Sequence, residues 1–162
     1  MKKLNQYIQE KFILNKNTKP IYKYFPKDKT ELRKILEERL REDKNADLND
    51  IDVSKITDMG FNGYNSEHGG LFEGLDPHNI DISKWDVSKV TSMNWMFIEC
   101  KNFNSDVSHW DVSKCTNMGL MFCKCEKFDS DLSKWNVSKV TNMHEMLYGC
   151  DSLKNKPSWY KE

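Results

Sequence analysis

Three consecutive copies of one 25-residue unit, without gaps, constrain this chain more than any other feature. The copies read DISKWDVSKVTSMNWMFIECKNFNS (81–105), DVSHWDVSKCTNMGLMFCKCEKFDS (106–130) and DLSKWNVSKVTNMHEMLYGCDSLKN (131–155). A fixed period between about 20 and 50 residues is typical of repeat proteins, in which each unit buries its apolar face against its neighbours. The repeat therefore predicts a stack of similar units and leaves the function open.

Two hydrophobic periods follow one another inside each unit. Trp85 and Val87 alternate with polar residues, as in a half-buried strand. The following apolar residues have the spacing of one helix face: Val90, Met93, Met96, Phe97 and Cys100. We therefore expect parallel strands on one side of the stack and short helices on the other, with equivalent Trp, Met, Phe and Cys side chains in buried columns.

The motif W-(D/N)-V-S-x-V-T-x-M-x-x-M-F-x-x-C resembles the BspA-type leucine-rich repeat family. This repeat occurs in bacterial surface proteins, mycoplasmas, protists and small bacterial or phage reading frames, and the resemblance covers residues 81–155. It implies the α/β class and a short right-handed leucine-rich-repeat-like solenoid used for protein recognition. It implies no enzyme activity and supplies no catalytic residues.

The first 46 residues do not repeat, and we expect them to form an α-rich capping segment on the first unit. A helix is expected over roughly 3–14. A second helix is indicated by the capping-box spacing of Asp28 and Glu31. Its apolar stripe consists of Leu32, Ile35, Leu36 and Leu40. The repeats then occupy 47–155, and 156–162 form a C-terminal tail.

A fourth, disguised repeat spans 47–80, where the period fails by nine residues because of an insertion near 61–70. Gly63, Gly69 and Gly70 argue against a helix there. One interpretation is a surface insertion that loops tolerate. The other is that the insertion displays Phe61 and Tyr64 as contact residues, since aromatic side chains dominate interface energetics.

The columns that differ between repeats are the informative ones, because the repeated letters are fixed by packing. They include apolar residues at positions expected to lie off the buried helix stripe. We expect a partner-binding surface made of Phe61, Tyr64, Trp95, Ile98, Leu120 and Tyr148. The alternative is that some of these side chains pack under loops.

A second candidate face is basic and consists of Lys84, His109 and Lys134. It could meet an acidic partner, but lysines in such a column more often form a solvated face. Interspersed aspartates argue against nucleic acid. Residues 1–46 carry 13 basic and 7 acidic side chains, and residues 47–162 carry 12 and 18, so head-to-tail association into a homo-oligomer stays open.

Neither metal nor cofactor chemistry is indicated by the five cysteines and four histidines. Cys123 and Cys125 form a lone C-x-C without a second pair, which is a weak zinc signal. The other cysteines occupy core columns, so Cys123 alone is expected to be reactive. The histidines lack the spacing of a triad, and an unexpected activity would involve His68 with Glu67.

These observations predict a small binding protein rather than an enzyme. We expect an intracellular, cytoplasmic inhibitor or adaptor, encoded by a bacterium or a phage, that occludes a surface of a host or defence protein. An odd number of cysteines agrees with a reducing compartment, and neither an export signal nor a membrane span is evident. The alternatives are a surface or secreted adhesin and a self-assembling structural protein.

Overall fold

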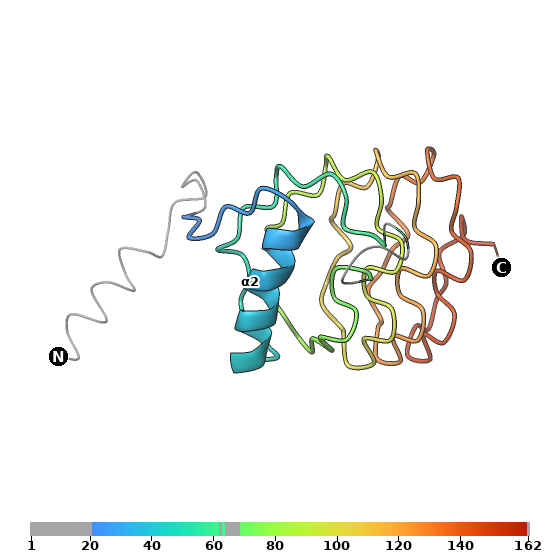
Figure 1. Cartoon of the computed structure of the whole chain (residues 1–162). Coiled ribbons are helices and arrows are strands. Elements are labelled where there is room, and N and C mark those ends of the chain that lie inside the picture. The colour runs from blue at the N-terminus through green and yellow to red at the C-terminus, as the bar shows by residue number, and fades with distance from the viewer. Residues whose placement is uncertain (1–20, 62, 64–68, 162) are drawn as a thin grey trace, which may run out of the picture.

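Figure 1 shows a stack of irregular coils lying side by side, with one helix against the first coil. The computed structural model describes residues 21–61, 63 and 69–161. Within these residues the only helix is α2 (Lys29–Glu42), and no extended strand forms. The expected helix over 3–14 lies outside the described residues.

The predicted fold class is wrong. Instead of parallel strands and short helices, the repeats are turns and irregular backbone, joined by isolated parallel bridges such as Ser92 to Asn117 and Asn117 to Asn142. The physical reason is the backbone conformation. Trp95 and Glu99 have φ values of 63° and 58°, and the equivalent positions in the next two coils are also left-handed. Two such residues per unit are incompatible with a right-handed helix, in which left-handed L-residues cost about 1–2 kcal/mol each.

Backbone hydrogen bonds connect successive coils in place of a helix ladder. The amides of Met93, Trp95, Phe97 and Glu99 donate to carbonyls of the next coil at distances between 2.8 and 3.0 Å. The intervening amides close short turns, as when Met96 N donates to Met93 O at 3.2 Å. Since buried backbone groups must be paired, this alternation replaces the expected helix with an inter-coil network. The expected strand around Trp85 and Val87 is replaced by turns, with Trp85 N donating to Ile82 O and Val90 N to Val87 O.

The core consists of the apolar residues that recur in each repeat, as predicted. The buried columns are Trp85, Trp110, Trp135; Met93, Met118; Met96, Met121, Met146; Phe97, Phe122, Leu147; and Cys100, Cys125, Cys150. Inside the core, aromatic rings of successive coils stack on one another. The ring centroids of Phe97 and Phe122, for example, are 5.5 Å apart. Met143 and Val140 of the fourth coil are only partly buried, because the residues that the structure describes include no further repeat to cover them.

Two columns also hold the coils together through side-chain donors. The indole of Trp135 donates to Val107 O at 3.1 Å, and Trp85 makes the same bond to Leu48 O at 3.0 Å. The thiols of Cys125 and Cys150 donate to Phe97 O and Phe122 O at 3.0 and 3.1 Å. These side chains therefore bury apolar surface and also satisfy carbonyls of the preceding coil, whereas the indole nitrogen of Trp110 is buried without a partner among the described residues.

Helix α2 begins where the capping pattern predicted. Asp28 accepts a hydrogen bond from Glu31 N at 2.9 Å, and Leu32, Leu36 and Leu40 are buried. Arg39, on another side of the helix, pairs with Asp50 at 2.9 Å. The helix is thus fastened to the first coil along both an apolar and a polar side.

The segment after the last repeat also packs on the stack. Pro157 is buried, and the Trp159 indole donates to Leu132 O at 3.1 Å, a bond like those made by Trp85 and Trp135. Tyr160 accepts a hydrogen bond from Leu147 N at 3.4 Å. These residues partly cover the last coil.

Candidate partner-binding surface

Stacking of the coils brings four equivalent positions into one row, formed by Phe61, Trp95, Leu120 and Glu145. Trp95 N donates to Gly119 O at 3.0 Å and Leu120 N donates to His144 O at 2.9 Å, so successive members lie on adjacent coils. The rings of Phe61 and Trp95 stack with centroids 5.1 Å apart and an angle of 27°. Phe61, Trp95 and Leu120 are half-buried. The row therefore presents apolar surface that is ordered and still accessible.

A second row runs beside the first and contains Ile98, Cys123 and Tyr148. Lys124 N donates to Tyr148 O at 2.6 Å, which places these coils next to each other. Ile98 is half-buried, Cys123 is buried and Tyr148 is 61 % exposed. We call the two rows together the aromatic band: Phe61, Trp95, Leu120, Glu145, Ile98, Cys123 and Tyr148.

The structure thus brings together five of the six residues expected to form the partner surface, and Tyr64 lies outside the described residues. They do not lie on a helix, as the sequence suggested. Trp95 and Leu120 instead occupy left-handed turn positions with φ of 63° and 57°. These turns aim the differing side chains outward, while the methionines next to them in the sequence point into the core.

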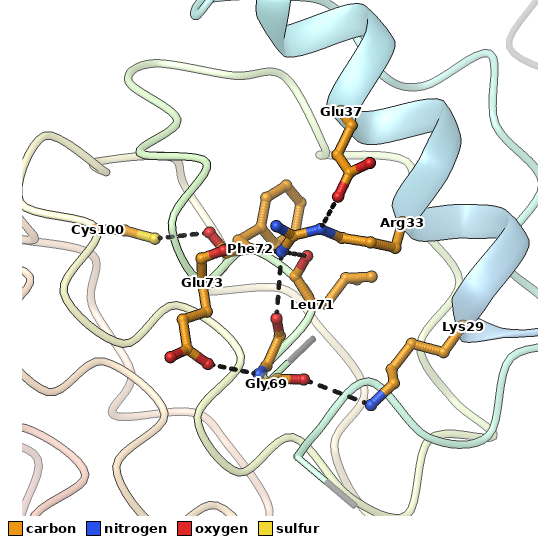
Figure 2. A network of polar contacts seen from close by, with 9 residues as sticks. Lys29, Arg33, Glu37, Gly69, Leu71, Phe72, Glu73 and Cys100 are labelled. Carbon is orange, nitrogen blue, oxygen red and sulfur yellow. Dashed lines mark hydrogen bonds and ion pairs between the residues drawn. The ribbon is translucent and has the colours of Figure 1, made fainter. Parts of the chain in front are cut away.

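Helix α2 holds the backbone from which Phe61 projects. Lys29 Nζ donates to Gly60 O and, at 3.5 Å, to Gly69 O, so one amine bridges both sides of the insertion. Figure 2 shows Lys29 and Arg33 reaching from α2 to this segment. Burial lowers the pKa of Lys29, and the nearby Asp58 carboxylate opposes that shift.

Arg33 is the strongest part of this contact, and its guanidinium is buried. Its Nη1 donates to Leu71 O at 2.9 Å and to Glu73 O at 2.8 Å, while Nε pairs with Glu37 at 2.8 Å (Figure 2). We call Lys29, Arg33 and Glu37 with these carbonyls the α2 clamp. The sequence did not reveal it, because basic residues on an amphipathic helix normally indicate a solvated face.

Two glycines let the insertion approach the second coil closely. A Cβ at Gly60 would lie 2.1 Å from Asn94 Oδ1, and a Cβ at Gly70 would lie 1.8 Å from the backbone oxygen of Trp95. The clamp and these contacts fix both ends of the segment against the coil that carries Trp95. The Phe61–Trp95 pair is therefore positioned by main-chain packing as well as by ring contact.

The second candidate face is exposed, with Lys84, His109 and Lys134 on successive coils. His109 Nε2 lies 2.5 Å from Ser83 O, so this ring is tied to the neighbouring coil. The column carries no hollow or apolar contact that would single it out as a binding site.

The cysteines are core residues, and the expectation that Cys123 is reactive is wrong. Its side chain is buried, and burial raises the pKa of its thiol. Burial also raises the pKa of Cys115 to about 11 and that of Cys150 to about 12. A thiolate is the reactive form, so these environments disfavour thiol chemistry.

Within the described residues, no group of three or more His, Cys, Asp or Glu side chains could hold a metal ion. His78 and Asp76 approach to 3.9 Å, but both are partly solvent-exposed. His68 and Glu67, which the sequence singled out as a histidine–carboxylate pair, lie outside the described residues. Nor does the described part of the chain contain a helix long and apolar enough to cross a membrane.

The chain matches no curated protein and no solved structure. Residues 30–160, from the start of α2 to the packed C-terminal segment, match a protein family. Because that region covers most of the chain, the protein belongs to the family described as "Mycoplasma protein of unknown function, DUF285".

Proposed function

We propose that this protein is a protein-interaction module that binds a partner through the aromatic band. The observation that carries the proposal is the Phe61–Trp95 stack, which is half-buried. Ile98 lies on the same coil as Trp95, Leu120 on the next coil and Tyr148 on the coil after that. Aromatic residues that project from a rigid scaffold are the usual energetic centres of protein interfaces.

Rigidity of the band supports this function. Each coil that carries a band residue is hydrogen-bonded to the next, and the α2 clamp fixes the segment before Trp95. Binding therefore orders few groups that were free beforehand, which lowers the entropic cost of association. A single partner could contact several coils at once.

The resemblance of the repeat to the BspA-type leucine-rich repeat supports protein recognition rather than catalysis. On this proposal the protein acts without chemistry, as an inhibitor or adaptor in the cytoplasm of a bacterial or host cell, by covering a surface of its target.

The test compares capture of partners from native host cells by wild-type protein, Trp95→Ala and Tyr148→Ala. Lys139→Ala serves as the matched control, because Lys139 is exposed and lies outside the band. We expect the two band variants to weaken binding to the captured partner by about tenfold or more, as for residues at the centre of an interface. Unchanged affinity for both, with both variants folded, would refute the band as the binding surface.

A further inference from the structure

The last coil ends the inter-coil hydrogen-bond network with donors left over. In the coil before it, the amides of Met118, Leu120, Phe122 and Lys124 donate to the carbonyls of Asn142, His144, Met146 and Tyr148 at 2.6 to 3.0 Å. The equivalent amides of the last coil belong to Met143, Glu145, Leu147 and Gly149. Residues 156–161, the described residues that follow this coil, do not form another coil that accepts from all four.

One of these four donors is satisfied by a side chain. Leu147 N donates to the hydroxyl of Tyr160 at 3.4 Å. The amides of Met143, Glu145 and Gly149 donate to no group among the residues that the structure describes. Unpaired backbone donors in a row are what an added strand requires.

A hollow lies at the same end of the stack. It has a volume of about 510 Å³ and is lined by Met143, His144, Glu145, Tyr148, Tyr160 and Lys161. Met143 is only partly buried, unlike its buried equivalents Met93 and Met118. Tyr148, 61 % exposed, adds apolar surface to this hollow. The end of the stack therefore offers main-chain donors and an uncovered apolar contact in one place.

We infer that this end binds an apolar peptide segment of another protein, which takes the turn conformation of a repeat coil and adds to the stack as one further layer. Carbonyl oxygens at alternate positions of the segment accept from Met143 and Glu145, and its apolar side chains cover Met143 and Tyr148. The two inner junctions give the geometry, since each pairs four alternate amides with four alternate carbonyls. His144 and Glu145 approach to 3.7 Å, so recognition rests on the main chain rather than on net charge.

The opposite end of the stack does not offer the matching surface. There the carbonyls of Gly60, Gly69 and Leu71 accept from Lys29 and Arg33, and α2 covers the first coil. A second copy could not stack its first coil on the free amides without displacing its own helix. This argument favours a segment of a different protein as the occupant.

The test uses a capped synthetic peptide of residues 116–124 with Cys123→Ser. In the intact chain this stretch presents the carbonyls of Asn117, Gly119, Met121 and residue 123 to the preceding coil. The peptide is titrated into the isotope-labelled full chain, and amide exchange is followed residue by residue. We expect saturable binding that slows exchange at Met143 and Glu145 by about tenfold or more, with Trp95, already bonded, unchanged. The mirror-image peptide of D-residues is the control and should not bind.

Two variants sharpen the result. Tyr160→Phe keeps the ring but frees the Leu147 amide, so the peptide should bind about threefold to tenfold more tightly. Trp95→Ala, in the aromatic band, should leave peptide affinity unchanged, which separates this site from the proposed function.

Several outcomes would overturn the inference. These are no saturable binding up to about 1 mM peptide, binding without protection of Met143 and Glu145, equal binding of the D-peptide, or loss of binding in Trp95→Ala. Protection of the same amides by concentration-dependent self-association, without peptide, would identify a second copy as the occupant and would likewise refute it.

Discussion

Replacing Arg33 by alanine should destabilise the protein strongly. Charged residues on a helix such as α2 are usually exposed and contribute little to stability, but Arg33 is buried. The guanidinium is 8 % exposed and donates to the carbonyls of Leu71 and Glu73 while pairing with Glu37. Alanine would remove the donors from which these two carbonyls and the Glu37 carboxylate accept.

The magnitude follows from the contacts. A hydrogen bond to a charged group contributes about 1.5–3 kcal/mol, and removing one partner of a buried ion pair costs about 3–5 kcal/mol. These contributions are not additive, because water can reach Glu37, whose side chain is 29 % exposed. We expect the free energy of unfolding to fall by about 3–5 kcal/mol. For a chain of this size that corresponds to a fall in Tm of about 6–20 °C.

Urea unfolding followed by tryptophan fluorescence measures this change. Arg41→Ala is the matched control, because it lies on the same helix, is exposed and changes helix propensity by the same amount. It should alter stability by less than about 0.5 kcal/mol. A loss below about 1 kcal/mol for Arg33→Ala would show that the clamp contributes little and that water replaces it readily.

Three further predictions concern the glycine contact, a thiol and the aromatic pair. Gly70→Ala should lower the free energy of unfolding by more than about 3 kcal/mol, since the added Cβ would meet Trp95 O. Gly74→Ala should lower it by only about 1–2 kcal/mol, because Gly74 has φ 73° but its Cβ would enter open space. Equal losses of the two variants in urea unfolding would contradict this. Burial raises the pKa of the Cys115 thiol from 9.0 to about 11. Between these two pH values the thiol ionises in the unfolded chain but not in the folded one. The stability that the buried neutral thiol contributes is therefore complete below pH 9 and is lost as the pH rises to about 11. Cys115→Val should therefore reduce the alkaline fall in unfolding free energy by about 1.4 kcal/mol per pH unit, and parallel wild-type and variant curves would refute this. A double-mutant cycle with Phe61→Leu and Trp95→Leu should give a coupling of about 0.5–1.5 kcal/mol, and a coupling near zero would mean that the ring stack is not stabilising.

The sequence predicted which residues are buried better than it predicted the backbone that buries them. Trp85, Met96 and Phe97 lie in the core as their repetition indicated. Spacing at three and four residues is typical of a helix, but the turns closed between residues three apart also place every third side chain on one side. The left-handed conformations of Trp95 and Leu120 have no sequence signal, because non-glycine residues rarely adopt them. Gly74 and Gly149, which are left-handed at the positions equivalent to Glu99, offer a hint.

Most residues of the candidate surface could be predicted from the sequence. The contacts that hold this surface in place could not. Trp95, Leu120 and Tyr148 were identified because they vary between units whose other letters are fixed. Arg33 and Tyr160 could not be found in this way, since both lie outside the repeats and act through carbonyl or amide groups. Such contacts form with main-chain groups that have no hydrogen-bond partner on a neighbouring coil. Which groups these are is determined only when the coils are stacked.

Along the side formed by residues 93–99 and their equivalents, the inter-coil amides all point from the earlier coil to the later one. Their peptide dipoles therefore add, as they do along an α-helix, and leave partial negative charge near the first coil and partial positive charge near the last. Lys29 and Arg33 meet the negative pole. Beyond their individual bonds, these two cations should neutralise a field that the repeats themselves generate and that would grow with every repeat added.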